Sequence, residues 1–369
     1  MEKDSLIAGG ARPNRRGFGS DNQSGVHPSV LEALARVNEG HTDAYGYDAW
    51  TLEAESLIAE LFGAPATVAL VMNGTGANVV GLAAALDPWS SVVAATDSHI
   101  NTDECGALEA VIGAKIVAVP TADGKLTPEL IAPWISGPAD EHRREPKVIS
   151  ISNLTELGTL YTVDEVRALA GFAHEHGLLL HVDGARIANA AASLSVPIAE
   201  LTGKAGVDLL SFGGTKNGMM GAEAVVLGKR GDASRLKYHR NQDLQLPSKQ
   251  RFLAAQFLAM YGPDATPPHA LECARHANTM AARLVEGVRA VGVRLQYEVG
   301  GNEVFAVLPR DVVGPLAERF RFYTWVEEFE PGYSSVRWVT SWDTTESDID
   351  ELVAALADAL AGIERSQNA

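Results

Sequence analysis

A lysine in a glycine-rich loop is the first side chain suited to covalent chemistry. It lies in residues 211–218 (SFGGTKNG), whose first residues end an apolar run that predicts a buried strand. Lysines usually lie on helices or exposed loops, so Lys216 among Gly and Thr indicates an amine that forms a Schiff base with a carbonyl compound. The alternative is an ordinary solvated loop lysine.

Two glycines with a hydroxyl between them form a second motif, in residues 73–78 (NGTGAN). The backbone N–H groups of Gly74, Thr75 and Gly76 would approach an anion at the N-terminus of a helix that we expect to begin near Ala77. Nucleoside triphosphate and dinucleotide sites lack their signatures here, because the spacing matches neither a P-loop nor G-x-G-x-x-G. The alternative is a plain glycine turn between a strand and a helix.

Two more motifs follow the ends of other predicted strands. Asp183, in residues 181–186 (HVDGAR), lies at the carboxyl edge where open α/β sheets bind ligands, and its carboxylate could keep a heterocyclic nitrogen protonated. The alternative is a surface ion pair with Arg186. His99, in residues 97–101 (DSHIN), could stack on a ring, although a lone histidine more often serves only as a hydrogen-bonding residue.

The order of these motifs along the chain is more informative than any one of them. A phosphate cradle, a ring-stacking histidine, a carboxylate partner for a pyridine nitrogen and a Schiff-base lysine are the parts that a pyridoxal 5'-phosphate site needs. The sequence therefore predicts pyridoxal phosphate as the cofactor.

Alternating strands and helices must position these motifs. Continuous apolar runs typical of strands that are covered on both faces occur at 67–72, 91–95, 115–119, 147–152, 178–182, 207–212 and 224–227. A helix is predicted from Thr162 to His176, with a capping box formed by Thr162 and Glu165 and a terminating Gly177. The pattern predicts an α/β fold with a mostly parallel sheet.

The chain is expected to divide into two domains. Residues 1–261 would form an N-terminal arm and a large cofactor-binding domain, and residues 262–369 a smaller C-terminal α+β domain. The break falls at 262–268 (GPDATPP). Beyond it we expect a helix at 269–291, strands at 294–298, 304–308 and 336–340, and a closing helix near 347–360.

Composition restricts the partners and the compartment. The 369 residues include 30 Lys and Arg against 47 Asp and Glu, and the resulting net charge of −17 argues against a nucleic-acid partner. The chain has only two cysteines, and residues 1–16 lack the apolar core of a signal peptide. No apolar run is long enough to span a membrane. These features predict a cytoplasmic protein with no membrane association. Because the sequence shows no cluster of metal ligands, no metal is expected.

At these motifs the chain resembles the low-specificity L-threonine aldolases, which are fold-type-I pyridoxal phosphate enzymes. The resemblance covers nearly the whole chain and includes the segments 18–22 (FGSDN), 44–46 (AYG), 104–106 (ECG) and 336–340 (VRWVT). It implies a pyridoxal-phosphate-dependent lyase that cleaves L-threonine, L-allo-threonine or related L-β-hydroxy-α-amino acids such as phenylserine. The products would be glycine and an aldehyde.

The resemblance also implies roles for particular residues. Lys216 would hold the cofactor covalently, and Asp183 would pair with its pyridine nitrogen. Tyr45 would reach the active site of a neighbouring subunit, which implies a homodimer or homotetramer with shared active sites. The implied cofactor-binding residues are Gly74, Thr75, Gly76, His99, Asp183, Arg186 and Lys216. The implied substrate-binding residues, which include the anchors of the carboxylate, are Ser20, Tyr45, Arg186 and Arg337.

Two positions depart from the family pattern. Glu156 stands where relatives carry a histidine, and it joins Lys216 and His99 as a candidate catalytic residue, acting as a base or only as a structural partner. Asn241 replaces an expected lysine. These departures leave open an alternative function, a transaldolase or synthetic aldolase that makes a β-hydroxy-α-amino acid in a biosynthetic pathway.

Overall fold

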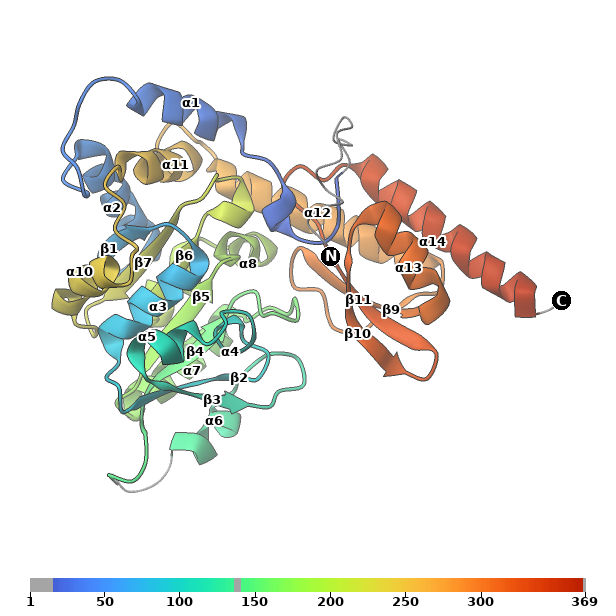
Figure 1. Cartoon of the computed structure of the whole chain (residues 1–369), viewed down its shortest axis with the longest axis horizontal. Coiled ribbons are helices and arrows are strands. Elements are labelled where there is room, and N and C mark those ends of the chain that lie inside the picture. The colour runs from blue at the N-terminus through green and yellow to red at the C-terminus, as the bar shows by residue number, and fades with distance from the viewer. Residues whose placement is uncertain (1–15, 136–140, 368–369) are drawn as a thin grey trace.

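The computed structural model describes residues 16–135 and 141–367 (Figure 1). Residues 1–15, which make up all of the polar N-terminal segment except Arg16, lie outside the described residues. A seven-stranded sheet forms the centre of the large domain, in the order β1-β7-β6-β5-β4-β2-β3. Its strands are β1 (Ala66–Val71), β2 (Ser90–Ala95), β3 (Lys115–Val119), β4 (Glu145–Ser152), β5 (Leu179–Gly184), β6 (Leu209–Gly213) and β7 (Glu223–Gly228).

The sheet is mostly parallel, as predicted. Strands β3, β2, β4, β5 and β6 pair in parallel, whereas β7 runs antiparallel to both β6 and β1. Every predicted strand of this domain is present. The inner strands are buried along most of their length, whereas the edge strands β1 and β3 are partly exposed. Val92 packs in one core with α3 and α5, and its neighbour Val93 packs in the other with α2, α7 and α11.

Helices cover both faces of this sheet (Figure 1). The predicted helix at 162–176 is α7, and the capping box of Thr162 and Glu165 is present at its start. The helix expected near Ala77 begins earlier, at Gly74, because the Asn73 side chain caps it. The large-domain helices are α1 (Pro28–Val37), α2 (Ala49–Phe62), α3 (Gly74–Ala85), α4 (His99–Thr102), α5 (Ala107–Ile112), α6 (Pro128–Ile135), α7 (Val163–Glu175), α8 (Ile187–Leu194), α9 (Ile198–Leu201), α10 (Ala233–Gln242) and α11 (Arg251–Tyr261).

The small domain is built on an antiparallel sheet in the order β10-β11-β9-β8. Its elements are α12 (His269–Ala290), β8 (Arg294–Leu295), β9 (Glu303–Pro309), α13 (Arg310–Phe320), β10 (Tyr323–Glu330), β11 (Tyr333–Val339) and α14 (Glu346–Gln367). Strand β10 was not predicted from the sequence, because this edge strand is mostly exposed and carries charged residues.

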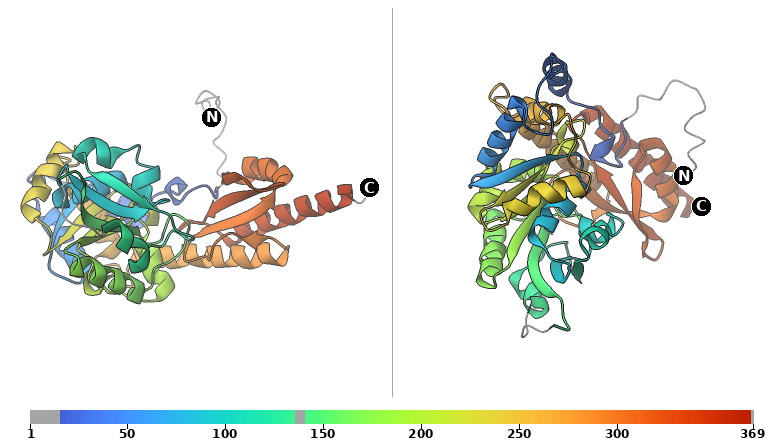
Figure 2. Two further views of the ribbon diagram at one scale, coloured as in Figure 1. Left: turned by 90° about the horizontal axis from the view of Figure 1, so that it is seen from below. Right: turned by 60° about the vertical axis from the view of Figure 1, so that its left-hand side comes forward.

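Helix α12 connects the two domains. Figure 2 shows the small domain extending from one end of the large domain, with α12 running between them. The first part of α12, with Cys273, packs in the large-domain core, and its later part, from Met280, packs in the small-domain core. Helix α12 therefore contributes to both hydrophobic cores. The domain boundary predicted from the sequence lies before this helix, between residues 261 and 262. That boundary remains a prediction.

The first described residues connect the small domain to the site. Phe18 packs in the small-domain core, and its carbonyl accepts a 2.8 Å hydrogen bond from the Val339 amide. The short helix η2 (Asp21–Gln23) follows and lies against the large domain. Within the two described ranges, none of the helices combines the length and apolar composition that crossing a bilayer requires.

Candidate active site

A cavity of about 390 Å³ lies at the carboxyl ends of β5 and β6, beside the N-terminus of α3. It brings together residues that are far apart in the sequence and includes most of the predicted site. Its lining includes Asn22, Asn73, Gly74, Thr75, Asn78, His99, Glu156, Asp183, Ala185, Thr215, Lys216 and Glu223. The four motifs identified in the sequence therefore meet in one place.

The N-terminus of α3 forms the anion-binding end of this cavity. The Asn73 side chain accepts a 2.7 Å hydrogen bond from the Gly76 amide, which directs the start of the helix toward the cavity. A Cβ atom at Gly74 would meet nothing within 4 Å, so the amides there are open to a ligand. A Cβ at Gly76 would lie 2.2 Å from the end of the Gln245 side chain, so a larger residue there would require this side chain to move. Open backbone amides at a helix N-terminus are suited to a phosphate group.

A chain of hydrogen bonds links the predicted pyridine partner to the predicted stacking residue. The Asn78 side-chain amide donates to Asp183 Oδ2 and to Glu104 Oε1, at 2.8 Å in each case. Glu104 Oε1 in turn lies 2.8 Å from Nδ1 of His99. Asp183 also accepts a 3.0 Å hydrogen bond from the Ala185 amide. These contacts hold the two carboxylates in fixed orientations.

The same contacts determine the charges of this group. Burial raises the pKa of Asp183, but the hydrogen bond from Asn78 and the charge of His99 outweigh it and hold the pKa below its ordinary value. The Asp183 carboxylate is therefore an anion at neutral pH. The hydrogen bond to Glu104 raises the pKa of His99 above its ordinary value, against the opposing effect of burial. An anionic carboxylate buried at a strand end can keep a nearby ring nitrogen protonated.

These residues also form a cluster that the sequence did not reveal. Ligand-type atoms of His99, Glu104 and Asp183 lie within 4.8 Å of one another. The hydrogen bonds through Asn78 account for this closeness, since each of the three side chains already has a partner in the chain.

Lys216 lies in the short helix η4 (Thr215–Asn217), directly after β6, and lines the cavity. The loop that carries it is held by Glu223, the first residue of β7. The Glu223 carboxylate accepts hydrogen bonds from the amides of Gly214 (3.0 Å) and Thr215 (3.3 Å). Burial raises the pKa of Glu223 to about 7, although these hydrogen bonds and the Lys216 charge oppose the shift.

The predicted carboxylate anchors lie beside this cavity, at the junction of the two domains. Arg186 is buried, and its Nε and Nη2 donate to the Asp21 carboxylate at 2.7 and 3.0 Å. Its Nη1 faces Glu303 at 3.2 Å. Arg186 is therefore paired along one edge with Asp21 and faces a second carboxylate.

Arg337, on β11, has more unused donors. Its Nη2 donates to the Gly19 carbonyl at 3.2 Å, its Nη1 lies 3.9 Å from Glu303, and its buried Nε has no partner among the described residues. Its guanidinium carbon lies 5.2 Å from the centre of the Trp325 ring, which orients the fork. Ser20, next to Gly19, accepts a 3.2 Å hydrogen bond from the Asn22 amide and is only partly buried.

Two other predicted residues take different positions. Glu156 is partly buried and lines the cavity. It lies near the charged groups of Arg186 and His99. Tyr45 is 52% exposed, does not line the cavity of its own chain, and has a φ of 59°. Tyr45 is therefore free to contact another molecule.

Sequence reasoning missed several residues of the site. Asn78, Glu104 and Asp21 lay inside quoted motifs, yet nothing in their spacing distinguished them. Glu223 and Glu303 had one available signal, a lone acid at the start of an otherwise apolar run. The groups that these acids contact come from elsewhere in the chain, so the signal alone did not suggest a role.

The residues of the cavity fit pyridoxal phosphate. The open amides at the start of α3 suit the phosphate, the anionic Asp183 suits the protonated pyridine nitrogen, and Lys216 supplies an amine in the same cavity. Asp183 is nine-tenths buried and aimed into the cavity, an environment that an anion tolerates only with cationic or donor partners.

The chain is similar to known proteins over most of its length. The sequence model of the beta-eliminating lyase family matches residues 17–311. The low specificity L-threonine aldolase of Pseudomonas aeruginosa is 41% identical over 338 residues, which cover 91% of this chain and 95% of that protein. The namesake enzyme of Escherichia coli K12 is 32% identical over 186 residues, covering 50% of this chain and 54% of that protein.

Solved structures show the same relationship. A threonine aldolase structure from Leishmania major superposes with a TM-score of 0.86 at 34% identity, covering 94% of this chain and 99% of that one. An aspartate aminotransferase variant from Thermus thermophilus superposes with a TM-score of 0.64 at 17% identity, covering 91% and 89%, and shares the fold.

Fold and site together define a fold-type-I pyridoxal phosphate enzyme, a lyase with an α/β large domain and a small antiparallel domain. Within that class, the chain belongs to the beta-eliminating lyase family and, inside it, to the low-specificity L-threonine aldolases.

Proposed function

We propose that this enzyme cleaves L-threonine, L-allo-threonine and related L-β-hydroxy-α-amino acids such as phenylserine to glycine and an aldehyde. The observation that carries the proposal is that Lys216, Asp183 and His99 line one cavity beside Arg186 and Arg337. The relatives that share most of the chain's length are named for this activity.

Pyridoxal phosphate supplies an electron sink when it is bound. The open amides of Gly74 and Thr75 would hold its phosphate, Gly76 would allow the close approach of the backbone, and Lys216 would provide the amine for covalent attachment. Asp183 keeps a proton on the ring nitrogen, since the Asn78 hydrogen bond maintains its negative charge. His99 would stack on the ring, and Glu104 fixes the orientation of its imidazole.

The arginines orient the amino acid. Arg337 and Arg186, with Ser20, hold the substrate's carboxylate, because a guanidinium fork matches a carboxylate bidentately. Holding that group would fix the orientation of the bonds at Cα, and this orientation would favour cleavage of the Cα–Cβ bond. Glu156, on the cavity wall near Arg186 and His99, would take the proton of the β-hydroxyl group.

The working enzyme is a homodimer or a homotetramer in which Tyr45 contributes to the neighbouring subunit's site. The exposure of Tyr45 and of the nearby Tyr47 (78%) and Trp50 (41%) supports this arrangement, because large aromatic groups gathered on a surface mark interaction sites. The reducing cytoplasm is the compartment that we propose for the enzyme, since its two cysteines, Cys105 and Cys273, are both free.

The test is an aldehyde assay on the purified, cofactor-loaded protein. L-Threonine, L-allo-threonine and L-phenylserine are supplied separately, and acetaldehyde or benzaldehyde is quantified. Aldehyde release from at least one of them is expected, with glycine formed in equal amount. A protein that releases no aldehyde from these three amino acids but joins glycine to a different aldehyde would contradict the proposal and support the synthetic alternative.

A further inference from the structure

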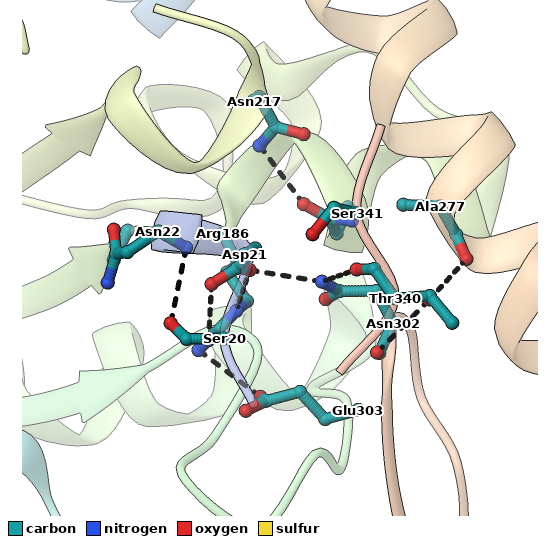
Figure 3. Close-up of polar contacts among 12 residues, drawn as sticks. Ser20, Asp21, Asn22, Arg186, Asn217, Ala277, Asn302, Glu303, Thr340 and Ser341 are labelled. Atoms are coloured by element: carbon teal, nitrogen blue, oxygen red, sulfur yellow. Dashed lines mark hydrogen bonds and ion pairs between the residues drawn. The ribbon is translucent and has the colours of Figure 1, made fainter. Parts of the chain in front are cut away.

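A third carboxylate lies against the two arginines of the proposed substrate-carboxylate site. Glu303, the first residue of β9, is completely buried. Its carboxylate lies between Arg186 Nη1, 3.2 Å from Oε2, and Arg337 Nη1, 3.9 Å from Oε1. Neither oxygen accepts a well-aligned hydrogen bond from the described part of the chain. Figure 3 shows Glu303 approaching Arg186 from the small domain, on the other side from Asp21.

Acidic groups outnumber the arginines at this junction. The charged side chains that face Glu303 are Asp21 from η2, Glu156 from the loop after β4, Arg186 from the start of α8 and Arg337 from β11. Asp21 already pairs with one edge of Arg186. If Glu303 is an anion, it and Asp21 balance the two guanidinium charges before any ligand arrives.

A substrate carboxylate would therefore enter a site whose positive charge is already neutralised. With Glu303 anionic, binding would leave one buried negative charge without a cationic partner, and such a charge is strongly unfavourable. Either Glu303 leaves the arginines or it loses its charge.

Glu303 cannot leave, because its surroundings hold it in place. Its backbone pairs with Val339 in the antiparallel sheet, and the preceding Asn302 donates to Asp21 Oδ2 at 3.0 Å and to the Thr340 carbonyl at 2.9 Å. The side chain has no exposed surface through which it could reach water. Burial also raises the pKa of Glu303, although both arginines oppose the shift. Protonation is thus the available response.

We propose that Glu303 competes with the substrate's carboxylate for Arg186 and Arg337, so that binding of an amino acid requires Glu303 to take up one proton. The inference rests on the proposed function only in assigning the arginine pair to a substrate carboxylate. It makes Glu303 a residue that couples substrate affinity to pH without touching the reacting bond.

The experiment measures binding of 3-hydroxybutanoate to the cofactor-loaded enzyme by calorimetry from pH 6 to 9. This probe has the carboxylate and hydroxyl of threonine but no amine, so it cannot react with the cofactor. Titrations in buffers of different ionisation enthalpy give the number of protons taken up. The wild-type protein is expected to take up about one proton at alkaline pH, where its affinity falls about tenfold per pH unit.

Glu303→Gln keeps the size of the side chain and removes its charge. The variant is expected to bind 3-hydroxybutanoate without proton uptake, with an affinity independent of pH and at least tenfold tighter than wild type at pH 9. Glu327→Gln, an equal charge change on the exposed β10, is the matched control and should behave as wild type. If Lys216 or His99 supplied the coupled proton instead, the uptake would persist in Glu303→Gln and would contradict the proposal.

Three results would overturn the inference. The first is binding by wild type with no proton uptake, and the second is uptake that persists in Glu303→Gln. The third is no binding by either protein at any pH, which removes the arginine pair as a carboxylate site. Aldehyde release from hydroxy amino acids is assayed on the same samples, so a failure of the proposed function is seen separately from a failure of the Glu303 coupling.

Discussion

The side-chain amide of Asn78 donates a 2.8 Å hydrogen bond to Asp183 Oδ2, and both groups are buried at the wall of the cofactor cavity. Asn78 lies on the first turns of α3, whereas Asp183 lies at the end of β5, so this bond joins the helix that would hold the phosphate to the strand that would hold the ring. The two ends of the cofactor site are thus aligned with each other by one amide group.

Replacing Asn78 with Ala should weaken cofactor binding. Asp183 would lose a donor that maintains its negative charge, and a hydrogen bond to a charged group contributes about 1.5–3 kcal/mol. The dissociation constant of pyridoxal phosphate, measured by titrating the apoenzyme, should therefore rise about tenfold to a hundredfold. Asn101→Ala, which removes an exposed side-chain amide from α4, is the control. An unchanged constant in Asn78→Ala would remove this role.

Replacing Lys216 with Ala should abolish both covalent attachment of the cofactor and turnover. The Schiff-base absorbance band, which lies between 300 and 550 nm and differs from that of the free cofactor, should be lost, because no other lysine lines the cavity among the described residues. Lys249→Ala, on an exposed loop, should keep the band. A band that survives in Lys216→Ala would show that a different lysine carries the cofactor.

Replacing Arg337 with Ala should chiefly weaken binding of the amino acid. Loss of a charge-assisted bidentate partner should raise the KM for L-threonine about a hundredfold, while the cofactor absorbance remains as in wild type. Arg337→Lys should recover only part of the loss, since an ammonium group lacks the planar fork. Steady-state kinetics provide the measurement, and an unchanged KM would rule out the carboxylate-anchor role.

Mixing two inactive variants should test whether active sites are shared. A hybrid dimer of Lys216→Ala and Tyr45→Ala subunits contains one site with both native residues, provided that Tyr45 acts across the interface. Random mixing after reversible dissociation should then restore about a quarter of wild-type activity, because half of the dimers are hybrids with one intact site. If Tyr45 acts within its own chain, the mixture stays inactive.

Protein stability should fall in mild acid because of His181. This residue lies beneath the site, completely buried between Ser150 and Ser211, at 2.8 and 3.1 Å. Burial lowers its pKa from 6.5 to about 4, although the Asp183 charge opposes the shift. Between these values the unfolded chain binds a proton that the folded chain does not, so His181 stabilises the fold fully above pH 6.5 and progressively less as pH falls toward 4.

In His181→Asn, the free energy of unfolding should therefore depend less steeply on pH, by the equivalent of about one bound proton. This difference in slope is expected even if the variant is less stable at every pH. Thermal unfolding midpoints of the cofactor-loaded protein from pH 4.5 to 7.5 provide the measurement. His41→Asn, on an exposed loop, should leave the dependence unchanged. Equal slopes in His181→Asn and wild type would contradict the expectation.

The large domain could be predicted from sequence because its strands are continuous apolar runs and its chemistry follows their ends. Lys216, Asp183 and His99 each come directly after such a run, and parallel strands bring their carboxyl ends to one edge. The start of α3 was predicted three residues too late, near Ala77, because glycine is a poor helix former. The Asn73 cap allows the helix to begin at Gly74.

The junction between the domains could not be predicted in the same way. Glu303, Arg186 and Asp21 lie in three separate parts of the sequence, and only folding brings them together. Strand β10 has little apolar content of its own and is defined by its pairing with β11. Features that depend on such long-range pairing leave no local periodicity to recognise.

The N-terminal segment has a practical consequence for anyone who shortens or fuses this chain. Residues 18–21 bind the small domain through the Phe18 backbone and side chain, support Arg337 through the Gly19 carbonyl, and hold Arg186 through Asp21. An expression truncation that removes Phe18 would disturb both arginines at once while leaving each of them in the sequence. A trimmed version that still binds the cofactor yet no longer recognises amino acids would be the expected product of such a cut.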